Sequence, residues 1–143
     1  MNYTYSKIRK RFIAICIDFL ILALLVLLES IICSSFMNQF IKNVIALITG
    51  IIYFSYFESS EKQATLGKRS MGIIVTDLEG NRLTMLKAIT RTIIKYLGSI
   101  VLLFTKISFI INIGILESLV AIFTPKKQAL HDLIAGSIVV DKE

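Results

Sequence analysis

An ionisable residue, Asp18, stands inside an apolar run from Phe12 to Leu28 that otherwise reads as a membrane span. A carboxylate placed in hydrocarbon costs a few kcal/mol, so it is retained only where it faces a partner, a polar cavity or a pathway. Arg11 lies at the mouth of the same run. These residues predict a membrane protein with a polar feature buried among its helices.

Composition supports this reading. Hydrophobic residues make up 55% of the 143 residues, and the chain holds a single proline. A membrane helix needs about 20 mainly apolar residues, so three or four crossings would take more than half of this chain. We therefore expect one membrane domain over residues 1–143, with no large soluble domain.

Three apolar blocks are candidates for membrane helices. The first predicted span covers residues 12–36 and the second covers residues 40–57. The third block, residues 93–123, is longer than one bilayer requires and carries interrupting polar and glycine residues. We interpret it as a helical hairpin with spans at 92–106 and 107–124. A single long tilted helix and a re-entrant pair are the alternatives.

Positive charge favours four crossings. Fourteen of the sixteen Lys and Arg residues lie in three segments, 1–11, 58–95 and 125–143. Basic residues concentrate on cytoplasmic loops, so all three segments are expected on the cytoplasmic side, with both termini inside. A three-span arrangement would put the basic C-terminal segment outside. The charge suits anionic lipids of the bilayer, whereas no basic, aromatic-interleaved patch indicates nucleic acid.

The N-terminal run fits a cleaved signal peptide poorly, since it is too long, contains Asp18 and precedes no clear cleavage site. The two cysteines, Cys16 and Cys33, lie too far apart on one helix to form a disulfide. We expect both to be inert packing thiols.

The loop 58–91 has its own pattern. Residues 64–69 read as a turn with a basic face, and 72–77 form a β-branched run that ends at a turn. Residues 82–84 would return as a second, hairpin strand. Thr84 would then cap a helix with Lys87, Arg91 and Lys95 on one stripe. This helix is expected to lie on anionic lipid, the alternative being that Arg91 or Lys95 turns inward to meet an acid.

The tail repeats the earlier strand pattern, because residues 136–141 match 72–77 in residue type. The two strands are predicted to pair, supported by a third strand or by the membrane surface. Residues 128–135 predict a short helix stopped by Gly136. His131 is expected at the surface near the interface, and Asp132 is equally compatible with solvent and with the interior. The fold class is thus all-α membrane protein, four transmembrane helices in two hairpins, with a small cytoplasmic β ribbon.

Several positions taken together resemble the bacterial RDD family of small integral membrane proteins: Arg11, Ala14 and Asp18, then 65–69 with Gly72, then Arg91, then 128–132 with Ala135 and Gly136. The family is named for one arginine and two aspartates, which correspond to Arg11, Asp18 and Asp132. The resemblance implies a multi-pass protein of the bacterial inner membrane. A transport role is commonly proposed for the family, and some members are regarded as cation/proton antiporters.

Helix geometry adds a prediction about this motif. Arg11 and Asp18 are seven residues apart, so they share a face at about 10.5 Å along the axis, too far to pair easily. Ala14 lies between them and would let another segment approach closely. The stripe of Arg11, Ala14 and Asp18 should therefore face protein rather than lipid. The basic groups expected nearest Asp18 are Arg91, Lys95 and His131.

Two functions remain open. In the first, the protein is a small cation/proton transporter in which Asp18 and Asp132 exchange protons and Arg11 tunes them. Four helices make a thin pathway, so transport would call for a homo-oligomer. In the second, the protein is an accessory or structural subunit whose Arg/Asp network fixes helix packing.

An enzyme is not expected. The chain has one histidine, no metal-spaced Cys/His cluster, no nucleophile with a plausible base and no phosphate-binding glycine loop. We therefore predict no catalytic residues, no cofactor and no metal site.

Overall fold

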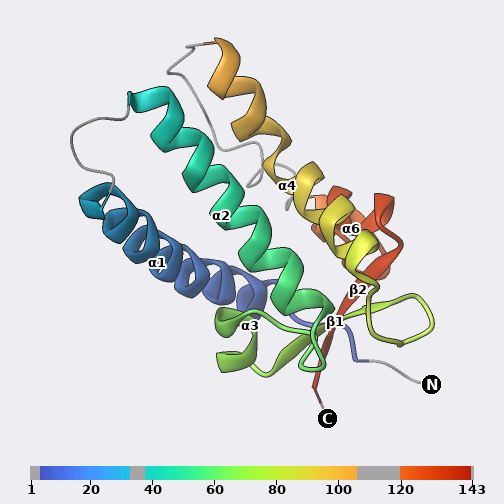
Figure 1. The fold of residues 1–143 in the computed structure, drawn as a ribbon. Helices are drawn as coiled ribbons and strands as arrows, with labels where there is room; N and C mark the ends of the chain where they lie inside the picture. The colour runs from blue at the N-terminus through green and yellow to red at the C-terminus, as the bar shows by residue number, and fades with distance from the viewer. Residues whose placement is uncertain (1–3, 33–37, 106–119, 143) are drawn as a thin grey trace.

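The computed structural model describes residues 4–32, 38–105 and 120–142. Three long helices extend from one end of the molecule, where two short helices and two strands gather (Figure 1). In chain order the elements are α1 (Ile8–Ile32), α2 (Gln39–Ser59), α3 (Leu66–Ser70), β1 (Ile73–Asp77), α4 (Met85–Thr105), α6 (Leu130–Ile134) and β2 (Ser137–Asp141). We call the end that holds α3, α6 and the strands the cap.

Two of the helices are long and apolar enough to cross a membrane. They are α1, with 25 residues and a mean hydropathy of 2.8, and α2, with 21 residues and a mean hydropathy of 1.6. α1 begins four residues before the predicted span 12–36, whose last residues lie outside the described part of the chain. α2 contains the predicted span 40–57. Most side chains of α1 are at least partly exposed, since only Ala14 and Asp18 are buried. Cys16 is accordingly exposed on α1 rather than packed, and Cys33 lies outside the described residues.

α4 is one continuous helix from Met85 to Thr105. Thr84 caps it as expected, because its hydroxyl accepts the backbone N–H of Lys87 at 3.3 Å. The expected interfacial helix and the expected span 92–106 are therefore parts of a single helix. Residues 120–123 are helical, but most of the expected span 107–124 lies outside the described residues. The described chain thus supports two membrane helices and does not establish four.

α2 and α4 lie side by side (Figure 1). They approach closely at Gly50, where an added Cβ would lie 2.6 Å from the hydroxyl of Tyr96. The rings of Phe54 and Tyr96 continue the contact, with centroids 6.1 Å apart. A small residue on α2 therefore lets the two helices pack closely enough to bury side chains between them.

The predicted pairing of the two β runs is confirmed. β1 and β2 are antiparallel, with Val75 opposite Val139. A third segment supports them, because the N–H of Ser6 donates to Val139 and the N–H of Asp141 donates to Thr4. This contact also places the two ends of the described chain side by side in the cap.

The expected local hairpin was wrong in its second strand. Residues 82–84 contribute only one isolated bridge, between Thr76 and Arg82. Asp77 instead closes the turn upon itself, since its carboxylate accepts the N–H groups of Glu79 and Asn81. The sheet is consequently formed between distant parts of the sequence, and its inner face shares a small core with α1: Ala14, Ile73, Val75, Leu83 and Val139.

Candidate functional site

Asp18 is buried in the middle of three hydrogen-bond donors. Its Oδ1 accepts the hydroxyl of Tyr53 and the backbone N–H of Gly67, each at 2.8 Å. Its Oδ2 accepts the hydroxyl of Thr65 at 2.6 Å. Only 1% of Asp18 is exposed. The carboxylate therefore fastens α1 to both α2 and the start of α3.

The helices approach closely here because Gly67 has no side chain. A Cβ at this position would lie 2.2 Å from the backbone oxygen of Ala14 and 2.8 Å from Cγ of Asp18. Ala14 is itself fully buried. The prediction that the face of Ala14 and Asp18 turns toward protein is thus confirmed, and α3 is the segment that covers it.

The partners expected for Asp18 were wrong. Within the described chain, no basic side chain forms an ion pair with it; its partners are two hydroxyls and a backbone amide. Thr65 is the N-cap of α3, so the carboxylate also lies at the positive end of that short helix. Both carboxylate oxygens of Asp18 are thus hydrogen-bonded by neutral groups.

A second group of residues forms an alternating row of charges, which we call the ion chain. It runs Lys68, Glu58, Arg91, Asp132, Arg11. Lys68 Nζ lies 2.5 Å from Glu58 Oε1, and Arg91 Nη1 lies 2.8 Å from Glu58 Oε2. Arg91 Nη2 lies 2.6 Å from Asp132 Oδ1, and Arg11 Nη1 lies 3.3 Å from Asp132 Oδ2. The five residues come from α3, α2, α4, α6 and α1, so the ion chain joins these five helices.

Asp132 is the most heavily coordinated acid of the ion chain. Besides the two arginines, its Oδ2 accepts the backbone N–H of Ala129 at 3.1 Å, and its Oδ1 lies 3.2 Å from Nε2 of His131. Burial by itself would raise the pKa of Asp132, but Arg91, His131 and Arg11 outweigh it and hold that pKa well below its usual range. The carboxylate is therefore charged at neutral pH.

Arg11 uses its guanidinium to tie the cap together. Nη1 donates to the backbone oxygen of Lys127 at 2.5 Å, Nη2 donates to that of Val139 at 3.0 Å, and Nε donates to the hydroxyl of Ser6 at 2.7 Å. With the ion pair to Asp132, one side chain holds the N-terminal segment, β2 and the approach to α6. A planar, multiply donating guanidinium suits this role better than an ammonium would.

The remaining predicted residues take different positions. His131 is buried, with 7% of its surface exposed, so its expected surface position was wrong. α6 turns its polar face inward, which places His131 Nε2 3.4 Å from Arg91 Nη2. Among the described residues Lys95 forms no ion pair with an acid. Its ammonium lies 3.4 Å above the ring centroid of Phe54, a cation–π contact.

Sequence reasoning assigned no contact to four residues of the site, Tyr53, Thr65, Glu58 and Lys68, although the family motif 65–69 includes two of them. Thr65 and Lys68 lie in a segment read as a turn with a basic face, yet Lys68 is buried. Burial lowers the pKa of Lys68, and Glu58 opposes that shift. Glu58 had one usable signal, an acid directly after the predicted span 40–57, where an unpaired buried charge would be costly.

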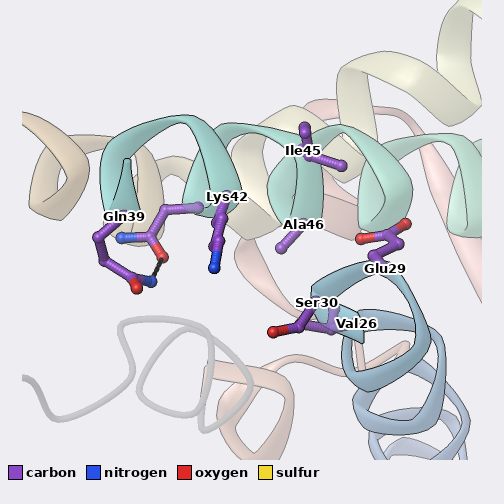
Figure 2. Close-up of a pocket in the computed structure, with 8 residues that line it drawn as sticks. Val26, Glu29, Ser30, Gln39, Lys42, Ile45 and Ala46 are labelled. Atoms are coloured by element: carbon purple, nitrogen blue, oxygen red, sulfur yellow. Dashed lines mark hydrogen bonds between the residues drawn. The ribbon is translucent and has the colours of Figure 1, made fainter. Parts of the chain in front are cut away.

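A separate hollow lies at the far end of α1 and α2. Its lining includes Glu29 and Ser30 of α1 and Gln39 and Lys42 of α2, which Figure 2 shows. The volume of the hollow is about 130 Å³. The carboxylate of Glu29 accepts the hydroxyl of Thr49 at 2.5 Å. The described residues include no group of three or more metal-ligating side chains. None of the residues that line the hollow belongs to the ion chain.

Two long apolar helices fastened by buried charges to a small mixed cap define a helical membrane protein. A model of the RDD family matches residues 5–136, which is most of the chain. The chain belongs to the RDD family, as its motifs indicated. No curated protein and no solved structure matches it.

Proposed function

We propose that the protein is a non-transporting membrane subunit, in which Asp18 and the ion chain lock the long helices to the cap in one register. The observation that carries this proposal is the saturation of the carboxylates. Asp18 has three donors, Glu58 has two cations, and Asp132 has two arginines and a backbone amide. A carboxylate so occupied is a poor exchange site, because any incoming cation must displace donors that the fold has already positioned.

Energetics support the same role. Removing one partner from a buried ion pair typically costs about 3–5 kcal/mol, since an uncompensated charge remains. The ion chain contains four such pairs in series, and each joins a different pair of helices. A requirement for these residues follows from folding alone, without a transport step.

We propose a topology that follows the charge pattern, with four crossings, the cap on the cytoplasmic side and a basic surface on anionic lipid. The pairing of residues 4–6 with β2 supports it, because both ends of the described chain then lie on one side. The inner membrane of a bacterium is the corresponding location.

Cation/proton transport is the second candidate. Its support is the position of Asp18, ten residues into the most apolar helix of the described chain. An acid at that depth is a usual element of proton pathways. In this function Asp132 would receive the proton in the cap, and assembly of several copies would complete the pathway.

Substitution of Asp18 by asparagine separates the two functions. The wild type, Asp18→Asn and the exposed control Glu61→Gln would be reconstituted in liposomes, and both unfolding and proton flux under cation gradients would be measured. We expect no cation-dependent flux in any of them, and a loss of stability confined to Asp18→Asn, because a hydrogen bond to a charged group contributes about 1.5–3 kcal/mol. A wild-type flux that a stably folded Asp18→Asn lacks would refute the subunit and establish transport.

A further inference from the structure

α6 is amphipathic, but its polar face is buried and its apolar face is exposed. Its charged residues His131 and Asp132 are buried, with 7% and 1% of their surfaces exposed. Its apolar residues Leu130, Leu133 and Ile134 are exposed by 44%, 44% and 57%. These three residues follow the i, i+3, i+4 spacing of one helix face. In water such an arrangement would leave an apolar stripe unprotected, so the outer face requires an apolar neighbour.

The ion chain fixes the depth of this face. Asp132 is held by Arg11 at the start of α1 and by Arg91 in the first turns of α4. Next to Arg11 on α1, 63% of the apolar residue Phe12 is exposed. α6 therefore lies level with the beginning of a candidate membrane helix, rather than far out on the cap.

Exposed apolar residues also precede α6 in the chain. Ile122 and Phe123 are exposed by 54% and 86%, and the exposed cation Lys126 follows them. Leu86, on the neighbouring helix α4, is exposed by 75%. Apolar side chains with a cation at their edge match the boundary of an anionic bilayer, where acyl chains meet phosphate groups.

We infer that α6 is an interfacial helix, with Leu130, Leu133 and Ile134 seated in an anionic lipid surface and Lys126 at its headgroups. The occupant is lipid rather than a protein, because the stripe is continuous in depth with the exposed surface of α1 and carries complementary charge. One face of this short helix would then contact the membrane surface, while its opposite face carries the carboxylate of Asp132. The inference holds for either function proposed above.

The absence of tryptophan from the chain makes the inference directly testable. Leu133→Trp introduces a single fluorophore at an exposed apolar position. The full-length variant would be reconstituted in vesicles of phosphatidylcholine and phosphatidylglycerol that carry a quencher near the headgroup, a quencher deep in the acyl chains or a soluble quencher in the water. We expect blue-shifted emission and a larger loss of emission with the headgroup quencher than with either of the others.

Two matched variants calibrate depth. Leu24→Trp, on the exposed middle of α1, should respond most to the deep quencher, and Leu78→Trp, in the turn after β1, should respond most to the aqueous one. Aqueous quenching of Leu133→Trp equal to that of Leu78→Trp would overturn the inference. Protection from all three quenchers would overturn it as well, since polypeptide would then cover α6. In the double variant Lys126→Gln, Leu133→Trp, the blue shift should depend less on the phosphatidylglycerol content of the vesicles. An unchanged dependence would refute the contact of Lys126 with anionic headgroups.

Discussion

Replacing Gly67 with alanine directly tests the close contact between α1 and α3. Alanine normally favours a helix over glycine by about 1 kcal/mol, and Gly67 lies inside a helix without an unusual backbone angle. Helix propensity alone thus predicts a more stable protein. The structure predicts the reverse, because the new Cβ would lie 2.2 Å from the backbone oxygen of Ala14, where ordinary contacts begin at 3.4 Å.

The magnitude follows from what must move. Backbone lies on both sides of the contact, so α3 has to withdraw from α1, and overpacking of this kind costs about 1–3 kcal/mol. Withdrawal also breaks the 2.8 Å hydrogen bond from the Gly67 N–H to the Asp18 carboxylate, at about 1.5–3 kcal/mol. After allowance for helix propensity, we expect Gly67→Ala to lower the free energy of unfolding by about 1.5–5 kcal/mol.

The assay is unfolding in mixed micelles titrated with sodium dodecyl sulfate and followed by circular dichroism. Arg69→Ala, an exposed position on the same short helix, is the control and should stay within about 0.5 kcal/mol of the wild type. If Gly67→Ala proves as stable as the wild type, α3 does not contact α1 as described. The hydrogen bonds from Thr65 and Gly67 to Asp18 would then be wrong as well.

Three further predictions concern the partners of the buried acids. Tyr53→Phe removes one hydroxyl from the carboxylate of α1 and should cost about 1.5–3 kcal/mol in the same unfolding assay, while exposed Tyr56→Phe should change little. Arg91→Lys should cost about 3–5 kcal/mol, because one ammonium cannot bridge two separate carboxylates; Lys87→Arg on the exposed side of α4 should be neutral, and equal effects would contradict the bridge. The lowered pKa of Asp132 means that the unfolded state binds its proton first. Its contribution is therefore complete above the ordinary value of 3.8 and is lost as the pH falls below it, so acid should destabilise the wild type more than Asp132→Asn.

Local patterns in the sequence predicted much of the fold. Apolar runs identified α1 and α2, and the matching β-branched segments identified β1 and β2 as partners. The cap of α4 at Thr84 and the stop of α6 at Gly136 were also predictable, since each depends on one residue and its immediate neighbours. The return strand at 82–84 failed beyond the single bridge between Thr76 and Arg82, because the N–H of Val75 in β1 donates to the backbone oxygen of Gln63 instead.

The basic stripe on α4 shows how a sound local rule falls short. In a helix, each step of four residues rotates the side-chain direction by about 40°. Three residues at this spacing therefore do not point in the same direction. Lys87 consequently remains exposed, Arg91 is buried in the ion chain, and Lys95 lies over the ring of Phe54. The spacing predicted a shared face, but packing against α2 divided it.

The sequence by itself determined that an acid, Asp18, is buried in an apolar chain, and the family resemblance singled out Arg11 and Asp132 beside it. Only the tertiary structure decided which partner each acid takes. Asp18 meets Gly67, 49 residues away, and Arg91 meets Asp132 across two different helices. Periodicity reports the face on which a residue lies, because it depends on neighbouring backbone angles alone. A hydrogen bond between distant segments depends on how closely they approach, and here the missing side chain of one glycine sets that distance.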